Sequence, residues 1–234
     1  MQVRDLVDQF GVSEMTIRRD LEQLGGEGRL LRTYGGARAP GQTIREQPYA
    51  AKAVERIAEK GRIARRAAEL VSDGDVILLD AGSTTAALAR SLRGRKNLTV
   101  VTVDLKIGLE LCDEPGIRVL VTGGTAQPGG YNLYGPIAEM MLRGLTVDLA
   151  FIGTSAIDLE QGLTTPNLDK VRLKQAMLRA ARRSVVLADA GKFGLRANFQ
   201  IAPLKAISLI ITDTGVPSQM ARVIRKEGVD LALV

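Results

Sequence analysis

Short apolar runs alternate with segments of helical periodicity from about residue 49 to the C-terminus. Several runs are almost continuously apolar, which is typical of strands buried on both faces of a sheet. The strand candidates are residues 76–79, 98–102, 118–121, 149–152, 185–188, 206–211 and 229–234. This alternation predicts an α/β fold, a mainly parallel sheet with helices on both faces.

Helical patterns fill the intervals between these runs. A long amphipathic helix is predicted over 50–71, and shorter helices over 84–92, 105–112, 136–145, 168–181 and 218–226. Residues 49–234 are therefore expected to form one α/β domain. Two prolines and a glycine in 40–48 predict a linker in front of it.

Composition narrows the possible functions. The chain of 234 residues has a formal net charge of +6 and a pI of about 9.7, which is compatible with a nucleic acid or an anionic ligand as partner. It has no histidine and one cysteine, Cys112, so triad mechanisms in their usual form, an intramolecular disulfide and a structural zinc site are not expected. We expect neither a metal nor a cofactor.

No apolar run approaches the roughly 18 residues that indicate a membrane span. No basic and apolar leader opens the chain, so a signal peptide is not expected. A reduced, cytoplasmic protein that does not contact a membrane is the expectation.

Residues 1–39 have the pattern of a helix-turn-helix with a wing. A first helix with one apolar face precedes a turn at Gly11 and a second helix that Ser13 is placed to cap. The early residues of such a second helix face the major groove. Residues 29–37 then fit a two-stranded wing. The predicted contacts to bases or phosphates are Ser13, Thr16, Arg18, Arg19, Arg32 and Arg38.

A pair of ordinary surface helices, whose arginines interact only with water, fits the same pattern. In residues 1–39 six arginines are balanced by six acidic residues. Any affinity for DNA therefore depends on which face the arginines occupy.

The stretch "DAGSTTAAL", residues 80–88, follows the first predicted strand and leads into a helix. Gly82 permits close approach of a ligand, and Ser83, Thr84 and Thr85 bring hydroxyl and backbone N–H groups to the start of that helix. Both features favour an anion such as phosphate. A strand-to-helix turn with a Ser or Thr cap is the alternative reading.

Further candidates follow other predicted strands, where ligands of open α/β sheets bind. Gly123 and Gly124 fit either a close approach to a ligand or a tight turn, and Lys174 fits either a ligand contact or a solvated helical lysine. The set of candidates is Asp80, Asp104, Gly123, Gly124, Gly153, Lys174 and Lys192.

The stretch "VSEMTIRRDLEQL" followed by "LLRTYGGA" resembles the winged helix-turn-helix signature of the DeoR family of bacterial transcription regulators. The resemblance continues through "DAGSTT", "VLVTGGT", "YGPIAEMML", "DLAFIG", "GLTTPN" and "VVLADAGKFG", in the family's order. Members usually carry a further helix in front, so the resemblance implies a module without its first helix, which puts DNA binding by this chain in question.

The family's C-terminal domain is similar to the group of ribose-5-phosphate isomerase, glucosamine-6-phosphate deaminase and CoA-transferase. The resemblance implies that residues 82–85 hold the phosphate of a sugar phosphate, with Asp80 and Asp104 beside the sugar and Lys192 at its polar groups. Val103 stands where members usually have Asn, and Ser155 stands where the related enzymes carry an acid.

The leading hypothesis is a transcription regulator, expected to be a repressor, whose C-terminal domain binds a phosphorylated sugar or polyol that modulates binding to operator DNA. A homo-oligomer, dimer or tetramer, follows from the family and from two-fold operators. The alternatives are an isomerase or deaminase-type enzyme, against which Ser155 argues, and a ligand-binding protein without DNA activity.

Overall fold

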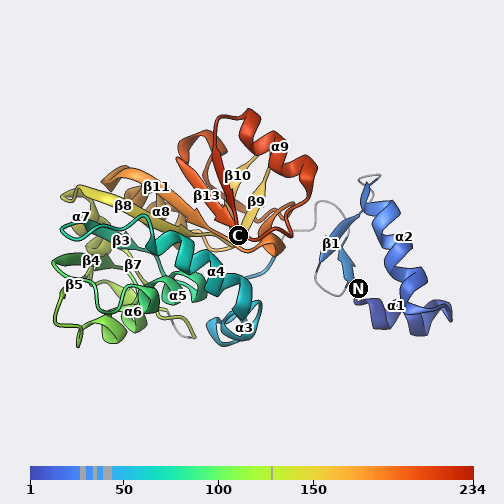
Figure 1. Ribbon diagram of the computed structural model, residues 1–234, viewed down its shortest axis with the longest axis horizontal. Coiled ribbons are helices and arrows are strands. Elements are labelled where there is room, and N and C mark those ends of the chain that lie inside the picture. Colours follow the sequence, from blue (N-terminus) through green and yellow to red (C-terminus); the bar gives the residue numbers. More distant parts are fainter. Residues whose placement is uncertain (27–29, 34–35, 39–43, 128) are drawn as a thin grey trace.

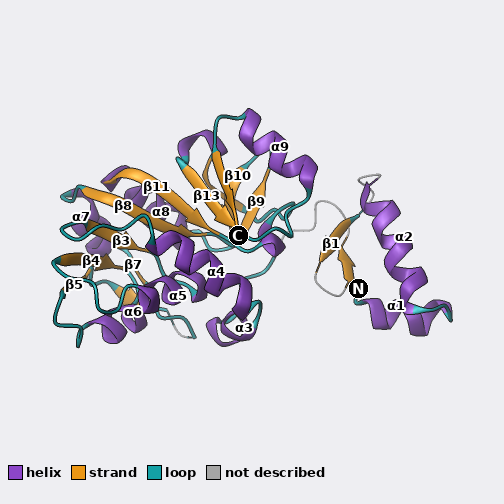
Figure 2. Cartoon of the chain, in the orientation of Figure 1, coloured by secondary structure: helices purple, strands orange, loops and turns teal. Residues whose placement is uncertain are grey.

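The computed structural model describes residues 1–26, 30–33, 36–38, 44–127 and 129–234. Figure 1 shows a large unit, in which helices cover a central sheet, and a small N-terminal unit that stands apart from it. Figure 2 shows strands inside and helices outside in the large unit, as the alternating sequence pattern predicts.

The central sheet has seven strands in the order β14-β13-β11-β8-β3-β4-β5, and every pair of neighbours is parallel. The α/β fold with a parallel sheet is therefore confirmed. The strands are β3 (Val76–Leu79), β4 (Leu98–Thr102), β5 (Ile117–Val121), β8 (Val147–Gly153), β11 (Ala181–Leu187), β13 (Leu209–Thr212) and β14 (Asp230–Leu233).

Alternate residues of each strand bury into opposite cores. Leu78 and Ile152 pack into a core with Met177, whereas Ile77 and Phe151 pack into a core with other helices. The first core includes residues of α7 (Pro136–Arg143), α8 (Asp169–Ala180) and α9 (Ser218–Lys226), and the second includes α4 (Ile57–Ala68), α5 (Ser83–Ser91) and α6 (Leu105–Leu111). Burial on both faces explains why the inner strands of the sheet are rich in apolar residues.

The strand order reverses between β3 and β8. The chain runs from β3 outward through β4 and β5 on one side, and from β8 outward through β11, β13 and β14 on the other. The connections that leave these two neighbouring strands diverge at their carboxyl ends, which opens a crevice there. This position locates the site described below.

The predicted helix over 50–71 is two helices, α3 (Tyr49–Val54) and α4. The break lies at Glu55, which is extended, and Arg56, which has a left-handed φ of 50°. Lys60 fixes the break because its buried ammonium donates to the carbonyl oxygens of Lys52 and Glu55, at the C-terminal end of α3. Helical periodicity continues across such a break, so the sequence pattern does not reveal it.

Several short elements have no counterpart in the sequence prediction. An antiparallel sheet has the order β12-β10-β9, and its strands are Phe199–Ala202, Gly162–Thr165 and Ala156–Asp158. A hairpin pairs β6 (Thr125–Ala126) with β7 (Leu133–Tyr134). The strand predicted over 206–211 is shorter, because a 3-10 turn at Leu204–Ala206 precedes β13.

The N-terminal unit contains α1 (Val3–Phe10), α2 (Glu14–Gly26) and a wing of β1 (Leu31–Thr33) paired with β2 (Gly36–Arg38). Among the described residues, its buried core consists of Val3, Leu6, Ile17, Leu21 and Ala37. The amino end of the chain closes against the wing, because the Met1 ammonium donates to the carbonyl of Ala37 at 3.0 Å. A Cβ on Gly36 would lie 2.0 Å from the carbonyl oxygen of Met1, so only glycine fits there.

Residues 44–48, which belong to the predicted linker, contact the large unit. Ile44 is buried with Ala156 and Ala197, and its N–H donates to the carbonyl of Arg196 at 3.1 Å. The rest of the predicted linker, residues 40–43, lies outside the described residues.

We predict that Ile17→Ala lowers the free energy of unfolding of the N-terminal unit by about 2–5 kcal/mol, because it removes a large side chain from a core of very few residues. Met15→Ala, on the same helix but with Met15 80% exposed, should change it by less than about 0.5 kcal/mol. Hydrogen exchange of the amides in 3–26 measures both. Equal exchange in the two variants would contradict this core.

Candidate functional site

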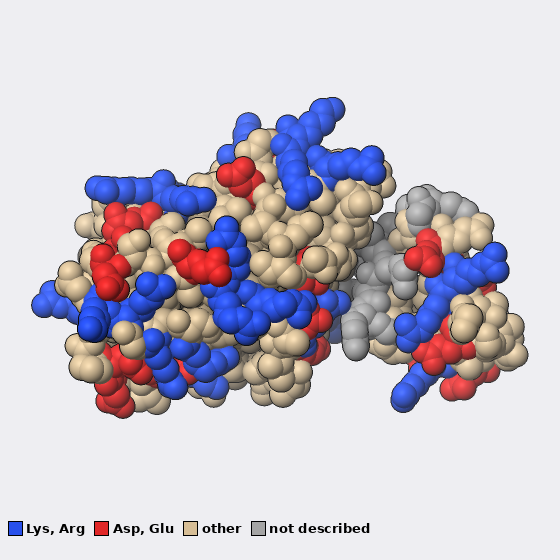
Figure 3. Space-filling model, in the orientation of Figure 1, with Lys and Arg blue, Asp and Glu red and all other residues tan. Residues whose placement is uncertain are grey.

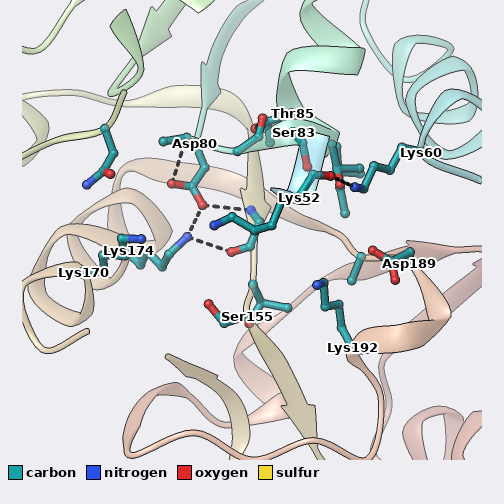
Figure 4. Close-up of a pocket in the computed structure, with 18 of the residues that line it drawn as sticks. Lys52, Lys60, Asp80, Ser83, Thr85, Ser155, Lys170, Lys174, Asp189 and Lys192 are labelled. Carbon is teal, nitrogen blue, oxygen red and sulfur yellow. Dashed lines mark hydrogen bonds and ion pairs between the residues drawn. The ribbon is translucent and has the colours of Figure 1, made fainter. Parts of the chain in front are cut away.

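A pocket with ≈ 700 Å³ of empty space, part of it open to solvent, lies at the carboxyl ends of β3, β8 and β11. Three connections line it: residues 80–85 after β3, 153–155 after β8 and 187–189 after β11, with Lys192 beyond them. Residues of α8, the segment before α4, Lys60 of α4 and Asn132 complete the wall (Figure 4). The pocket therefore occupies the crevice where the strand order reverses.

Asp80 and Lys174 form a buried ion pair at the base of this pocket. The Lys174 ammonium donates to Asp80 Oδ2 and, at 2.7 Å, to the carbonyl oxygen of Gly153. Asp80 also accepts from the N–H groups of Gly153 at 2.9 Å and Ala81 at 2.8 Å. The pair thus joins the ends of β3 and β8 to α8. Figure 4 shows the Lys174 side chain reaching Asp80.

Gly82 precedes α5 with φ at 152°, a conformation that side chains disfavour. The Thr85 hydroxyl donates to the Gly82 carbonyl at 2.9 Å, which holds the loop against the first turn of the helix. Ser83 and Thr84 line the pocket and are partly exposed. The first N–H groups of an α-helix have no partner within the helix, so this end of α5 faces the pocket as a donor surface.

Lysine ammonium groups surround the same space (Figure 4). The lining contains the five lysines Lys52, Lys60, Lys170, Lys174 and Lys192, and three carboxylates, those of Glu46, Asp80 and Asp189. The lining is therefore net positive by two charges, from five minus three. Positive charge and helix N–H groups at one site favour an anionic ligand.

Sequence reasoning missed Lys52, Lys60 and Lys170. The only signal for Lys170 is its spacing of four residues before Lys174, which places both on one face of α8. Lys52 and Lys60 lie on what the sequence presents as one helix, so the break at Glu55 was needed to bring both to the pocket.

Burial and neighbouring charges shift the pKa values of Glu46, Lys170 and Lys60, which line the pocket. Burial raises the pKa of Glu46, but the ammonium groups of Lys170 and Lys52 outweigh it and hold that pKa below its usual value. Burial lowers the pKa of Lys170, which Glu46 partly opposes and Lys52 and Lys174 reinforce. The pKa of Lys60 is lowered by burial, against the effect of Asp189.

Asp104, Gly123 and Gly124 do not line the pocket. Asp104 is buried and caps α6, because its carboxylate accepts from the N–H groups of Lys106 at 2.8 Å and Ile107 at 3.1 Å. Burial raises its pKa. Gly123 and Gly124 follow β5, the outermost strand, and take positive φ in a turn. Asp104 follows β4, and the two glycines follow β5. These strands lie on one side of the point between β3 and β8 where the strand order reverses, whereas the pocket lies at that point.

The carboxylates after β8 are not placed for proton transfer in the pocket. Ser155, which lines the wall of the pocket, has no carboxylate. Asp158 instead accepts two hydrogen bonds from Arg196, both at 2.9 Å, and Glu160 accepts a third at 2.7 Å. Neither acid is among the residues that line the pocket.

The predicted DNA contacts on α2 lie on its exposed side. Ser13 caps the helix, accepting from the N–H of Thr16 at 3.1 Å, as predicted. Arg18 donates to Glu14 at 2.6 Å, and Arg19 is exposed. Met15 is 80% exposed while Ile17 is buried, which settles which of the two faces the core. Arg32 and Arg38 have backbone positions in the wing, and their side chains lie outside the description.

Charge on the N-terminal unit is mixed. Figure 3 shows both basic and acidic side chains on the visible face of this unit, consistent with the balanced count of the sequence. In the described part of the chain, no helix is long and apolar enough to cross a membrane. The same residues contain no group of His, Cys, Asp and Glu side chains suited to a metal ion.

Two family models match the chain: the DeoR-like helix-turn-helix domain over residues 1–43 and the DeoR C terminal sensor domain over residues 55–214. The chain belongs to the DeoR family. As a DeoR-family protein it is a DNA-binding transcription regulator and not an enzyme, which answers the isomerase alternative.

Curated proteins that are named as regulators match this DeoR-family chain along nearly their whole length. The HTH-type transcriptional regulator GlpR of Haloferax volcanii is 39% identical over 97% of this chain and 89% of that protein. The putative aga operon transcriptional repressor of Escherichia coli O157:H7 is 35% identical, over 100% and 88%. The glycerol-3-phosphate regulon repressor of Escherichia coli is 28% identical, over 100% and 92%.

Solved structures with partial similarity include ribose 5-phosphate isomerase A from Methanocaldococcus jannaschii, with 22% identity, a TM-score of 0.43 and coverage of 57% of this chain and 53% of that chain. A probable sor operon regulator from Shigella flexneri has 11% identity, a TM-score of 0.44 and coverage of 77% and 85%. At these scores the fold assignment rests on the sheet topology itself.

We predict that Asp80→Leu destabilises the large unit by about 3–5 kcal/mol, because it leaves the Lys174 ammonium buried without a carboxylate. Lys174→Met should cost less, since Asp80 keeps two backbone N–H donors. Urea unfolding measures both, with Glu69→Gln as the control, because it breaks an exposed pair with Arg66 that is worth at most about 1 kcal/mol. A larger loss in Lys174→Met than in Asp80→Leu would refute this arrangement.

Proposed function

We propose that the chain is a repressor whose pocket binds a phosphorylated sugar or polyol, and that this ligand modulates its binding to operator DNA. The single observation that supports the proposal is the start of α5, where helix N–H groups and lysine ammonium groups face one space at the switch point. A phosphate matches this site because it accepts several hydrogen bonds and carries negative charge.

The proposed phosphate contacts are residues 82–85, with Lys52 and Lys170 opposite. Asn132 and Asp189 supply polar groups for hydroxyls deeper in the wall, and Lys192 reaches the same wall. Asp80 and Lys174 act through each other, since their charges are already paired. Among the sequence candidates, Asp104, Gly123 and Gly124 have no part in this proposal.

The names of relatives support this ligand class. The glycerol-3-phosphate regulon repressor is named for a phosphorylated polyol, and the match covers 100% of this chain and 92% of that protein.

We also propose that residues 1–39 read operator DNA, that 40–48 link them to the effector domain of 49–234, and that two or more copies act together. A single helix-turn-helix reads one half-site, and a dimer reads two at a fixed spacing. A ligand that alters the placement of the two modules changes the fit to that spacing. As a partner of operator DNA the protein would act in the cytoplasm.

We predict that Thr84→Glu abolishes the ligand response, because it places a carboxylate against the bound phosphate. Thr125→Glu is the matched control, since Thr125 is exposed on β6 and does not line the pocket. Thermal shifts with a panel of phosphorylated sugars and polyols are measured for both variants and for the wild type.

The expected result is that a panel compound raises the melting temperature of the wild type and of Thr125→Glu but not of Thr84→Glu. Equal stabilisation of all three by the same compound would refute the placement of the phosphate at α5. Both variants should melt within a few degrees of the wild type without ligand, because exposed or partly exposed positions contribute little to stability.

For the DNA surface, we predict that Arg19→Ala weakens operator binding by about 1–3 kcal/mol if Arg19 contacts a base. If Arg19 contacts a phosphate, the slope of the logarithm of the binding constant against the logarithm of the salt concentration falls by about one. Arg4→Ala, an exposed arginine of α1, is the control. Binding to an operator selected from genomic fragments is measured at several salt concentrations. An Arg19 variant indistinguishable from the Arg4 variant would exclude α2 as the reading helix.

A further inference from the structure

The ligand pocket contains an acid from the segment that leads to the N-terminal unit. Glu46 lies within 44–48, which precedes α3, and its carboxylate lines the pocket. Lys52 donates to Glu46 Oε1 at 2.9 Å, and Lys170 lies 3.1 Å from Oε2. Both ammonium groups face the space in which the phosphate is proposed to bind.

The same segment is held at two further points. The N–H of Ile44 donates to the carbonyl of Arg196, and Ile44 is buried beside Ala156 and Ala197. At the other end, the N–H of Tyr49 donates to the carbonyl of Gly129 at 3.4 Å, and its ring packs edge-on against Tyr131 at 5.1 Å. Between these ends, the ion pairs of Glu46 are what tie the segment to the lysines of the pocket.

We propose that Glu46 occupies the anion site in the unliganded protein, and that a phosphorylated ligand displaces it and thereby releases the segment next to the DNA-binding unit. This inference rests on the proposed function, because it assumes that a phosphate binds between α5 and the lysines. Glu46 is the internal counterpart of that phosphate, and the lysines are the groups for which the two compete.

The competition follows from the charges. Lys52 and Lys170 converge on one carboxylate, and the Lys170 side chain is mostly buried, with 14% of it exposed. A phosphate placed against the same ammonium groups would lie close to the Glu46 carboxylate, and two neighbouring anions repel each other. The ligand brings more negative charge and several acceptor oxygens, so it takes the lysines from a single carboxylate.

Displacement of Glu46 couples ligand binding in the pocket to release of residues 44–48. A ligand that must displace Glu46 binds the released state more tightly than the held state, and this difference is what shifts the population. By the same linkage, the factor by which the ligand favours release of Glu46 equals the factor by which release of Glu46 tightens ligand binding. Ile44 lies two residues before Glu46 in the same segment. Its hydrogen bond to the Arg196 carbonyl is therefore expected to weaken when the segment is released.

The other role that the geometry allows for Glu46 is a direct contact to ligand hydroxyl groups. The two roles predict opposite effects of Glu46→Gln, which keeps the shape of the side chain and removes its charge. If Glu46 competes with the ligand, the variant binds more tightly. If Glu46 holds the ligand, the variant binds more weakly.

The first test measures binding of inorganic phosphate and of glycerol 3-phosphate to the full chain by calorimetry. We expect Glu46→Gln to bind both at least about fivefold more tightly than the wild type, the lower end of typical coupling between sites. Glu69→Gln, which removes one negative charge from an exposed ion pair outside the pocket, should bind like the wild type. Unchanged or weaker binding by Glu46→Gln would overturn the proposal.

The second test follows the segment itself, by hydrogen exchange of the Ile44 amide that donates to Arg196. We expect saturating phosphate to speed this exchange at least about fivefold in the wild type, and Glu46→Gln to show faster exchange without phosphate. Tighter binding with no change at Ile44 would indicate a general effect of charge and would overturn the release.

Calorimetry and hydrogen exchange together distinguish failure of the phosphate site from failure of the role of Glu46. If the wild type binds neither phosphate compound in calorimetry, the proposed function fails and the competition fails with it. If the wild type binds and Thr84→Glu does not, but Glu46→Gln neither tightens binding nor loosens Ile44, the pocket stands and only the role of Glu46 is wrong.

Discussion

The ion pair of Asp80 and Lys174 is the interaction on which the pocket depends. It joins the loop after β3, the end of β8 and the face of α8 at the one place where the sheet order reverses. Removing two charges from water is costly unless each finds several partners. Here Asp80 has the ammonium and two backbone N–H groups, and Lys174 has the carboxylate and a backbone carbonyl. These contacts hold the start of α5 and the wall of β8 in a fixed relation.

The charges of the pocket suit recognition better than catalysis. Each carboxylate of the lining has a partner: Glu46 has two lysines, Asp80 has Lys174, and Asp189 accepts from the N–H of Gly191. An isomerase needs a carboxylate that is available to take a proton from a sugar carbon. The acids after β8, Asp158 and Glu160, are bound to Arg196 instead. This arrangement is consistent with membership of a family of regulators.

Much of the scaffold could be predicted from sequence. Strands β3 and β4 coincide with predicted strands, because strands buried on both faces are rich in apolar residues. The loop at Gly82, which the sequence offered either as an anion site or as a capped strand-to-helix turn, lines the pocket. The short strands β9, β10 and β12 gave no such signal, since none of them is a continuous apolar run.

The sequence could not place side chains whose role depends on strand order or on contacts between segments distant in sequence. Asp104 and Asp80 both follow buried strands, and only the order of the sheet puts one at the switch point and makes the other a helix cap. Glu46 lies in a proline-containing segment that sequence reads as a linker, and Lys52 reaches the pocket only because α3 ends at Val54. Their roles follow from contacts between segments that are distant in sequence, such as Glu46 with Lys170.

The position of the phosphate is tested most directly by a crystal structure of the full chain. The crystal should contain the phosphorylated compound that raises the melting temperature of the chain most. The account predicts phosphate oxygens within hydrogen-bonding distance of the N–H groups at the start of α5, around Ser83 and Thr84, with Lys52 or Lys170 on the opposite side. A phosphate bound elsewhere on the molecule, with the start of α5 facing only water, would contradict it.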